Sequence, residues 1–147
     1  MIVREGGLGR IFVLRLEDGD RLPDCLEQLA MDKLIRGAAC LMLGGLGGGK
    51  LVVGPEDGDA ERIQPMLREL VGAHEVAAVG TLFPDSSGQP KLHMHATVGR
   101  GDASLTGCVR PGVDVWKIAE VVVIEITDTG LARKIDPSLG LEVLSIE

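Results

Sequence analysis

Hydrophobic and polar residues alternate along several short stretches of this 147-residue chain, which is the pattern of β-strands with one buried face. In residues 10–16, Phe12, Leu14 and Leu16 fall on one face of such a strand, and a turn follows. Further apolar stretches bounded by Gly, Pro or Asp are predicted as strands: 38–43, 51–53, 75–83, 92–98, 106–109, 121–127 and 141–146. The third and fourth of these form an antiparallel hairpin around an exposed loop.

One segment has the spacing of a helix instead. Apolar residues recur every three or four positions, which predicts an amphipathic helix over about residues 22–36, with Asp20 as its cap and Gly37 as its stop. Residues 63–70 fit either a short helix or an irregular connection. Many strands and one helix predict an α+β fold, a single domain over residues 1–147 with a mostly antiparallel β-sheet. The apolar face of the helix consists of Leu22, Cys25, Leu26, Leu29, Ala30 and Leu34.

Composition narrows the class of protein. Hydrophobic residues make up 45% of the chain but aromatic residues only 2%, so the core has to be aliphatic. The three cysteines are an odd number without CxxC spacing, and the first residues do not combine a basic region with a long apolar stretch, so we expect a reducing cytoplasm. No apolar run has the length of a membrane span, so we expect no membrane partner.

The charge balance argues against a free-standing DNA-binding protein. Fifteen Lys and Arg residues against 22 Asp and Glu give a net charge of −7, and no run of basic residues interrupts this acidic background. An acidic chain repels polyanions, and affinity for nucleic acid comes mostly from basic side chains that contact phosphates. A local basic patch stays open, because many arginines lie in the first half of the chain.

The strongest candidate for a functional site is the pair His93 and His95, followed thirteen residues later by Cys108. Residues i and i+2 of a strand project from the same face, so the two imidazoles can share one ligand. Glu75 and Glu120 are candidates to orient an imidazole, or else solvated strand residues. The alternative for the main group is that hydrogen bonds satisfy the histidines and that Cys108 is a small buried hydrophobic residue.

His74 is a second candidate for the third ligand, although as a lone residue it fits an ordinary histidine at a strand edge.

A glycine-rich segment formally satisfies the phosphate-binding pattern G-x-x-x-x-G-K between Gly44 and Lys50. Leu51 stands where that motif needs a hydroxyl for magnesium, and the apolar residues after it predict a strand rather than a helix whose N-terminus could hold phosphate. We therefore predict a turn or bulge within a sheet and a solvated lysine.

The order of the segments resembles the plants-and-prokaryotes conserved (PPC) domain family, which is often labelled as proposed DNA-binding. The resemblance covers nearly the whole chain and implies an α/β domain with an antiparallel sheet that assembles as a homotrimer. It rests on residues 13–20, 38–46, 75–76, 92–95, 106–109, 119–123, 131–136 and 140–144 together.

The resemblance also implies a metal site. In prokaryotic members a Gly-Gly-His-Leu stretch follows the His-x-His strand, and its histidine can join the pair. Here residues 106–109 read Thr-Gly-Cys-Val, so Cys108 stands where the third histidine would be. Zinc accepts two imidazoles and one thiolate and can leave a fourth position open.

Two functional hypotheses follow. The first is a DNA-associated or regulatory module, in which the trimer surface or a partner contacts DNA, since the AT-hook of the plant proteins is missing from this sequence. The second is a metal-binding or small-molecule-binding protein, or a metal-dependent enzyme that uses a zinc-bound water with Glu75 or Glu120 as proton acceptor. The sequence names no ligand.

Overall fold

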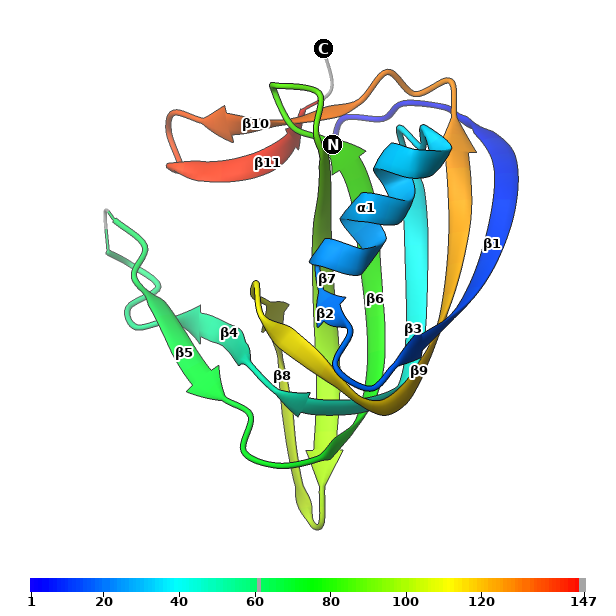
Figure 1. The fold of residues 1–147 in the computed structure, drawn as a ribbon. Helices are drawn as coiled ribbons and strands as arrows, with labels where there is room; N and C mark the ends of the chain where they lie inside the picture. Colours follow the sequence, from blue (N-terminus) through cyan, green and yellow to red (C-terminus); the bar gives the residue numbers. More distant parts are fainter. Residues whose placement is uncertain (61, 146–147) are drawn as a thin grey trace.

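A long antiparallel β-sheet dominates the computed structural model, which describes residues 1–60 and 62–145 (Figure 1). Its strands follow the order β1-β9-β3-β6-β7-β8-β4-β5, with the short β2 paired to β9, and a separate hairpin is formed by β10 and β11. The elements are β1 (Gly7–Glu17), β2 (Arg21–Leu22), α1 (Asp24–Lys33), β3 (Ala38–Gly48), β4 (Lys50–Pro55), β5 (Pro65–Glu69), β6 (His74–Pro84), β7 (Pro90–Arg100), β8 (Ala103–Val109), β9 (Val113–Thr127), β10 (Ala132–Asp136) and β11 (Leu141–Ser145).

Every strand pair in the described residues is antiparallel, and α1 is the one helix there, so the predicted fold is confirmed. The last predicted strand, 141–146, corresponds to β11, although Ile146 lies outside the described residues. Within the described part of the chain, no helix is long and apolar enough to cross a lipid bilayer.

The helix is shorter than predicted at both ends. Leu22 pairs with Val113 as part of β2, and Pro23 caps the helix in place of Asp20. At the other end Leu34 adopts a left-handed backbone with φ of 56°, which closes the helix three residues before Gly37. The side chain of Leu34 is therefore 82% exposed rather than part of the apolar face, whereas Leu26 and Ala30 are buried.

The glycine-rich segment continues β3 instead of ending it. The pairing of β3 with β9 shifts register between Gly44 and Leu46 and again between Leu46 and Gly48, so the predicted bulge is confirmed. After Gly49 the chain enters β4, a strand, and the structural context of a phosphate-binding loop is absent there. Residues 65–69 are a strand as well, β5, which pairs with β4, so neither alternative offered for this segment was right.

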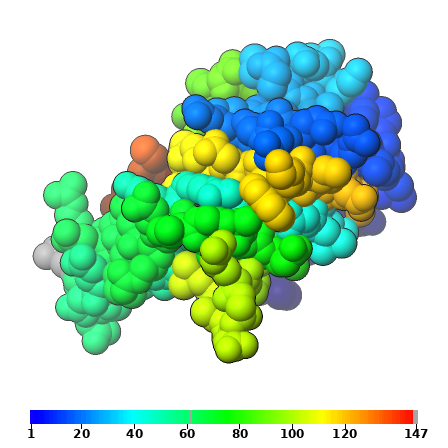
Figure 2. All heavy atoms as spheres, turned by 60° about the horizontal axis from the view of Figure 1, so that its bottom comes forward, coloured from blue at the N-terminus to red at the C-terminus, as the bar shows by residue number. Residues whose placement is uncertain are grey.

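The two faces of the sheet differ in burial. Side chains such as Met42, Met94 and Val121 point to the inner face, which α1 covers, and they are almost fully buried. The outer face carries exposed apolar side chains, of which Val79 is 62% exposed and Val13 77% exposed. Alternation along each strand separates the two sets. In the space-filling view the β4–β5 segment and the β7–β8 turn project from the main body (Figure 2).

Candidate metal centre

Strand register brings His93, His95 and Cys108 to one face of the sheet. His95 and Cys108 are directly paired residues of β7 and β8, and Met94 between the histidines is buried on the opposite face. Directly opposed residues have Cβ atoms about 5 Å apart, close enough for their side chains to share a ligand. The alternation that places Met94 in the core therefore also places both imidazoles beside the thiol.

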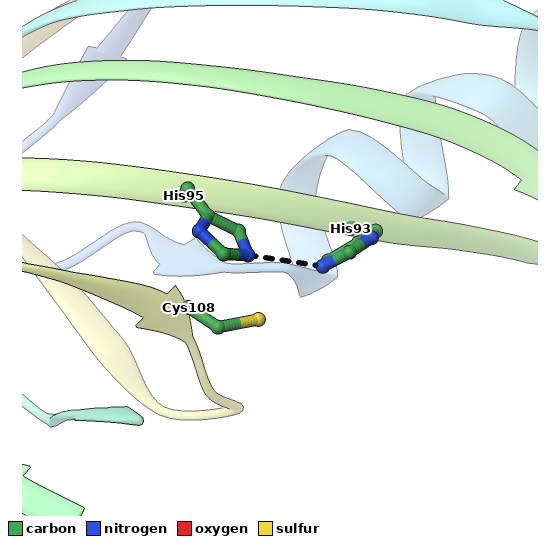
Figure 3. Close-up of side chains that lie close together, drawn as sticks. All are labelled: His93, His95 and Cys108. Carbon is green, nitrogen blue, oxygen red and sulfur yellow. Dashed lines mark hydrogen bonds between the residues drawn. The ribbon is translucent and has the colours of Figure 1, made fainter. Parts of the chain in front are cut away.

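The donor atoms of the three side chains converge. His93 Nε2 lies 3.2 Å from His95 Nε2, and one donor from each of the three residues lies within 4.8 Å of the others. The Cys108 side chain points toward the two rings rather than away from them (Figure 3). Nitrogens bound at about 2.0–2.1 Å to a tetrahedral zinc are about 3.4 Å apart, so the imidazole pair already has the spacing of two zinc ligands.

Hydrogen bonding alone can also account for the histidine pair. At 3.2 Å, one ring can donate an N–H to the unprotonated nitrogen of the other, with the rings inclined at 67°. Among the residues that the structure describes, the Cys108 thiol has only a long contact of 3.9 Å with the carbonyl of Val109. The same three side chains thus fit a metal-free hydrogen-bonded pair as well as a three-donor metal group.

The group opens into a pocket of about 360 Å³ at the junction of the sheet with the β10–β11 hairpin. Arg133 of β10 forms one wall, and its guanidinium donates from Nη2 to Thr81 Oγ1 at 2.8 Å. Thr81 is the residue paired with His93, so Arg133 lies over the same part of the sheet. The lining residues are Lys91, Leu92, His93, His95, Cys108, Arg110, Arg133, Leu141 and Glu142.

Burial and nearby positive charge shift the pKa values of His93 and Cys108. Burial lowers the pKa of His93, and the charges of Arg133 and Arg110 lower it further, so the neutral imidazole that a metal requires is favoured. Burial raises the pKa of the Cys108 thiol, but the same two arginines oppose that rise. Cys25 and Cys40 have no such cations, and burial raises their pKa values to about 11.

The other sequence candidates lie elsewhere. Glu75 shares the outer face but is four residues along β6 from the partner of His95, roughly 13 Å away. Glu120 lies on β9, three strands from β7, and neither glutamate lines the pocket. His74 bonds to the carbonyl of Gly72 near the start of β6. The carboxylate that does line the pocket is Glu142.

Sequence reasoning missed the charged wall of the pocket. Arg133 and Glu142 belong to β10 and β11, and no strand was predicted over residues 132–136. Lys91 is two residues from His93, and Arg110 is two residues from Cys108. This proximity in sequence could have indicated that both cations lie near the site.

Solved structures share this fold. A metal-containing protein from Archaeoglobus fulgidus superimposes with a TM-score of 0.87 and 23% identity, over 99% of each chain. A proposed DNA-binding protein from Ralstonia eutropha JMP134 gives a TM-score of 0.77 and 23% identity, over 92% of this chain and 90% of that one. At these identities the similarity establishes the fold.

Sequence comparison gives two further findings. The family model of the Plants and Prokaryotes Conserved (PCC) domain matches residues 3–127. The chain is also 29% identical over 144 residues to the bifunctional protein GlmU of Synechococcus sp. (strain JA-2-3B'a(2-13)). That match includes 94% of this chain but only 20% of the relative, so the chain spans about one fifth of the relative's length.

Proposed function

Because this chain belongs to the Plants and Prokaryotes Conserved (PCC) family, the one that the order of its segments predicts, we propose that it is a homotrimeric metal-binding protein. Its metal ligands are His93, His95 and Cys108. The observation that carries the proposal is the convergence of two imidazoles and a thiol within 4.8 Å. The name of the Archaeoglobus relative, a metal-containing protein with the same fold, supports it.

Zinc is the metal that fits this donor set best. Imidazole nitrogen and thiolate sulfur are both good zinc ligands, and a bound metal deprotonates the thiol despite its raised pKa. Three protein ligands leave one tetrahedral position open, where zinc would supply a Lewis acid to a ligand from the pocket. The free thiols of Cys25, Cys40 and Cys108 fit a reducing compartment such as the cytoplasm.

The trimer part of the proposal draws on the outer face of the sheet. A row of directly paired residues crosses this face from β1 to β6 and then continues into His95 and Cys108. Most apolar side chains in that row are exposed in the single chain, with Val122 half-buried, and contiguous exposed apolar surface is typical of protein interfaces. The apolar members of the row are Val13, Val122, Leu41 and Val79.

DNA association is the second candidate function. The Ralstonia relative carries the name of a proposed DNA-binding protein, and this favours the candidate. The net charge of −7 opposes it. A fluorescence anisotropy titration with duplex DNA at low salt tests it: binding that weakens steeply with added salt supports the candidate, and no binding removes it.

Elemental analysis of protein purified without an affinity tag tests the metal proposal. We expect about one zinc ion per chain in the wild type and in His74→Ala, because His74 is remote from the donor group. His93→Ala and His95→Ala should each lose the metal while keeping the circular dichroism spectrum of the wild type. Absence of metal in the wild type, together with no gain in melting temperature on adding zinc, would reject the proposal.

A further inference from the structure

Positive charge is concentrated in the pocket beside the three donors. Lys91, Arg110 and Arg133 line it, and Glu142 is the one carboxylate among the lining residues. The chain as a whole carries a net charge of −7, so the pocket has the opposite sign of charge from the chain. A metal cation at the donor group would add to the excess. Such a pocket attracts an anion rather than a second cation.

Arg133 is the most informative member of this cluster because it is only 4% exposed. Its guanidinium donates to three oxygens, Thr81 Oγ1 at 2.8 Å, Thr81 O at 3.4 Å and Lys91 O at 3.5 Å. All three acceptors are neutral, and within the described residues no carboxylate forms an ion pair with it. Glu142 compensates this charge only in part, and a buried charge that is incompletely compensated is costly, so a counter-charge from a ligand would stabilise this arrangement.

Arg110 lines the same pocket as Arg133. It follows β8 directly after Val109 and is exposed, with its backbone N–H donating to the carbonyl of Lys50. Both arginines line the same pocket as His93 and Cys108. An anion between the arginines would therefore also lie beside the donor group.

We infer that the pocket binds a small molecule through an oxyanion group, a carboxylate or a phosphate. One oxygen of that group takes the open position of the metal, and others accept hydrogen bonds from Arg133 and Arg110. The planar guanidinium presents paired N–H donors that can bind two oxygens of one carboxylate or phosphate group. A volume of about 360 Å³ suits a small metabolite. The inference rests on the proposed metal site for one of its contacts.

Removing the charge of Glu142 should have the opposite effect on anion binding from removing an arginine. Its carboxylate interacts favourably with Arg133 and partly offsets the cationic charge of the pocket. An incoming anion is repelled by this carboxylate and competes with it for Arg133. Removing the charge with Glu142→Gln should therefore tighten anion binding, while removing a cation should weaken it.

Isothermal titration calorimetry of zinc-loaded protein with inorganic phosphate and, separately, with malonate tests the inference. We expect at least one of the two to bind, with Kd raised about tenfold in Arg110→Gln and lowered several-fold in Glu142→Gln. Arg110 and Glu142 are exposed, so both variants should fold. Arg15→Gln is the matched control, since Arg15 is exposed on β1 at the far edge of the sheet and should leave Kd unchanged.

The outcomes separate the two proposals. If zinc binds but neither probe does, or if Arg110→Gln binds as tightly as the wild type, the oxyanion site is wrong and the metal site stands. If zinc does not bind, the same titration is carried out on metal-free protein. Anion binding that is weakened in Arg110→Gln would still support the arginine contacts, and no anion binding would reject them. Displacement of bound phosphate by a duplex oligonucleotide would overturn the assignment to a small molecule.

Discussion

His95 and Cys108 face each other directly across the β7–β8 hairpin, which turns through only the two residues Gly101 and Asp102. In a hairpin the turn fixes the register, and a shift of one residue sends every side chain of a strand to the other face. The meeting of imidazole and thiol is thus a consequence of the short turn together with the alternation of both strands.

Replacing Cys108 should separate a ligand from a packing residue. Cys108→Ala should lose zinc, whereas Cys108→His should keep about one zinc per chain, because imidazole is an equally good zinc ligand at that position. Zinc content after dialysis measures this, with Cys25→Ala as the matched control because Cys25 is another free thiol, remote from the group. Retention of full zinc content by Cys108→Ala would show that the thiol is not a ligand.

The ion pair of Arg10 and Glu125 should make stability depend on pH. Arg10 donates from Nε and Nη2 to the two carboxylate oxygens, both at 2.7 Å, and these hydrogen bonds lower the pKa of Glu125 to about 2. The stabilisation is present above the ordinary carboxyl pKa near 4.5 and is lost as the pH falls toward 2. At pH 7, Glu125→Gln should cost about 1 kcal/mol, since Arg10 is half exposed.

Urea unfolding between pH 2 and pH 7 measures this dependence. The curves of the wild type and Glu125→Gln should converge near pH 2. Glu17→Gln, which removes an exposed ion pair with Arg15, should change stability by no more than a few tenths of a kcal/mol. If the free energies of unfolding of the wild type and Glu125→Gln differed by the same amount at every pH down to 2, this would contradict an ionic contribution of Glu125 to stability.

Gly44 should be intolerant of any side chain. Its φ is +139°, and a Cβ atom there would lie 2.5 Å from Ala119 Cα and 2.5 Å from the carbonyl oxygen of Ile118. Gly44→Ala therefore has to shift β3 away from β9, at a cost of about 3 kcal/mol, which thermal unfolding measures. Gly58→Ala is the control because nothing lies within 4 Å of its added Cβ. Equal melting temperatures of the two variants would contradict the close contact of β3 and β9.

The outer face should control assembly. Leu41 is 45% exposed at the middle of the apolar row, and Leu41→Asp places a charge where a trimer would exclude water. Light scattering should then give the mass of a trimer for the wild type and of a monomer for Leu41→Asp. Leu34→Asp, at an exposed leucine at the end of α1, should remain trimeric. A monomeric wild type at micromolar concentration would contradict the proposed assembly.

Local patterns predicted which side chains converge on the sheet, while their role as metal ligands stays a prediction. Alternation along residues 92–98 put His93 and His95 on one face. Cys108 was a candidate from the sequence, and the resemblance placed it where the family's third histidine would be. The contribution of Arg133 to the pocket was not predicted, because Arg133 belongs to the β10–β11 hairpin. The periodicity of one strand does not indicate which hairpin packs against which face of the sheet. Long-range packing, rather than local propensity, brings that guanidinium to Thr81.

The predicted helix and the predicted glycine turn differ from the observed elements for physical reasons. Leu34 fits the helical period, but its left-handed backbone ends the helix and exposes it. The glycines form the predicted bulge, but inside a continuous β3 rather than after its end. A Cβ at Gly44 or Gly45 would lie within 2.6 Å of the backbone of β9, so these positions need glycine. Local backbone conformation ended the helix at Leu34, and the pairing of β3 with β9 outweighed the low strand propensity of glycine.

The metal centre is tested most directly by an anomalous difference map, recorded at the zinc absorption edge from crystals of the zinc-loaded protein. We expect one strong peak at about 2.0–2.1 Å from Nε2 of both His93 and His95 and at about 2.3 Å from the Cys108 sulfur. A map with these three side chains well ordered and no peak between them, or with the zinc bound by other residues, would contradict it.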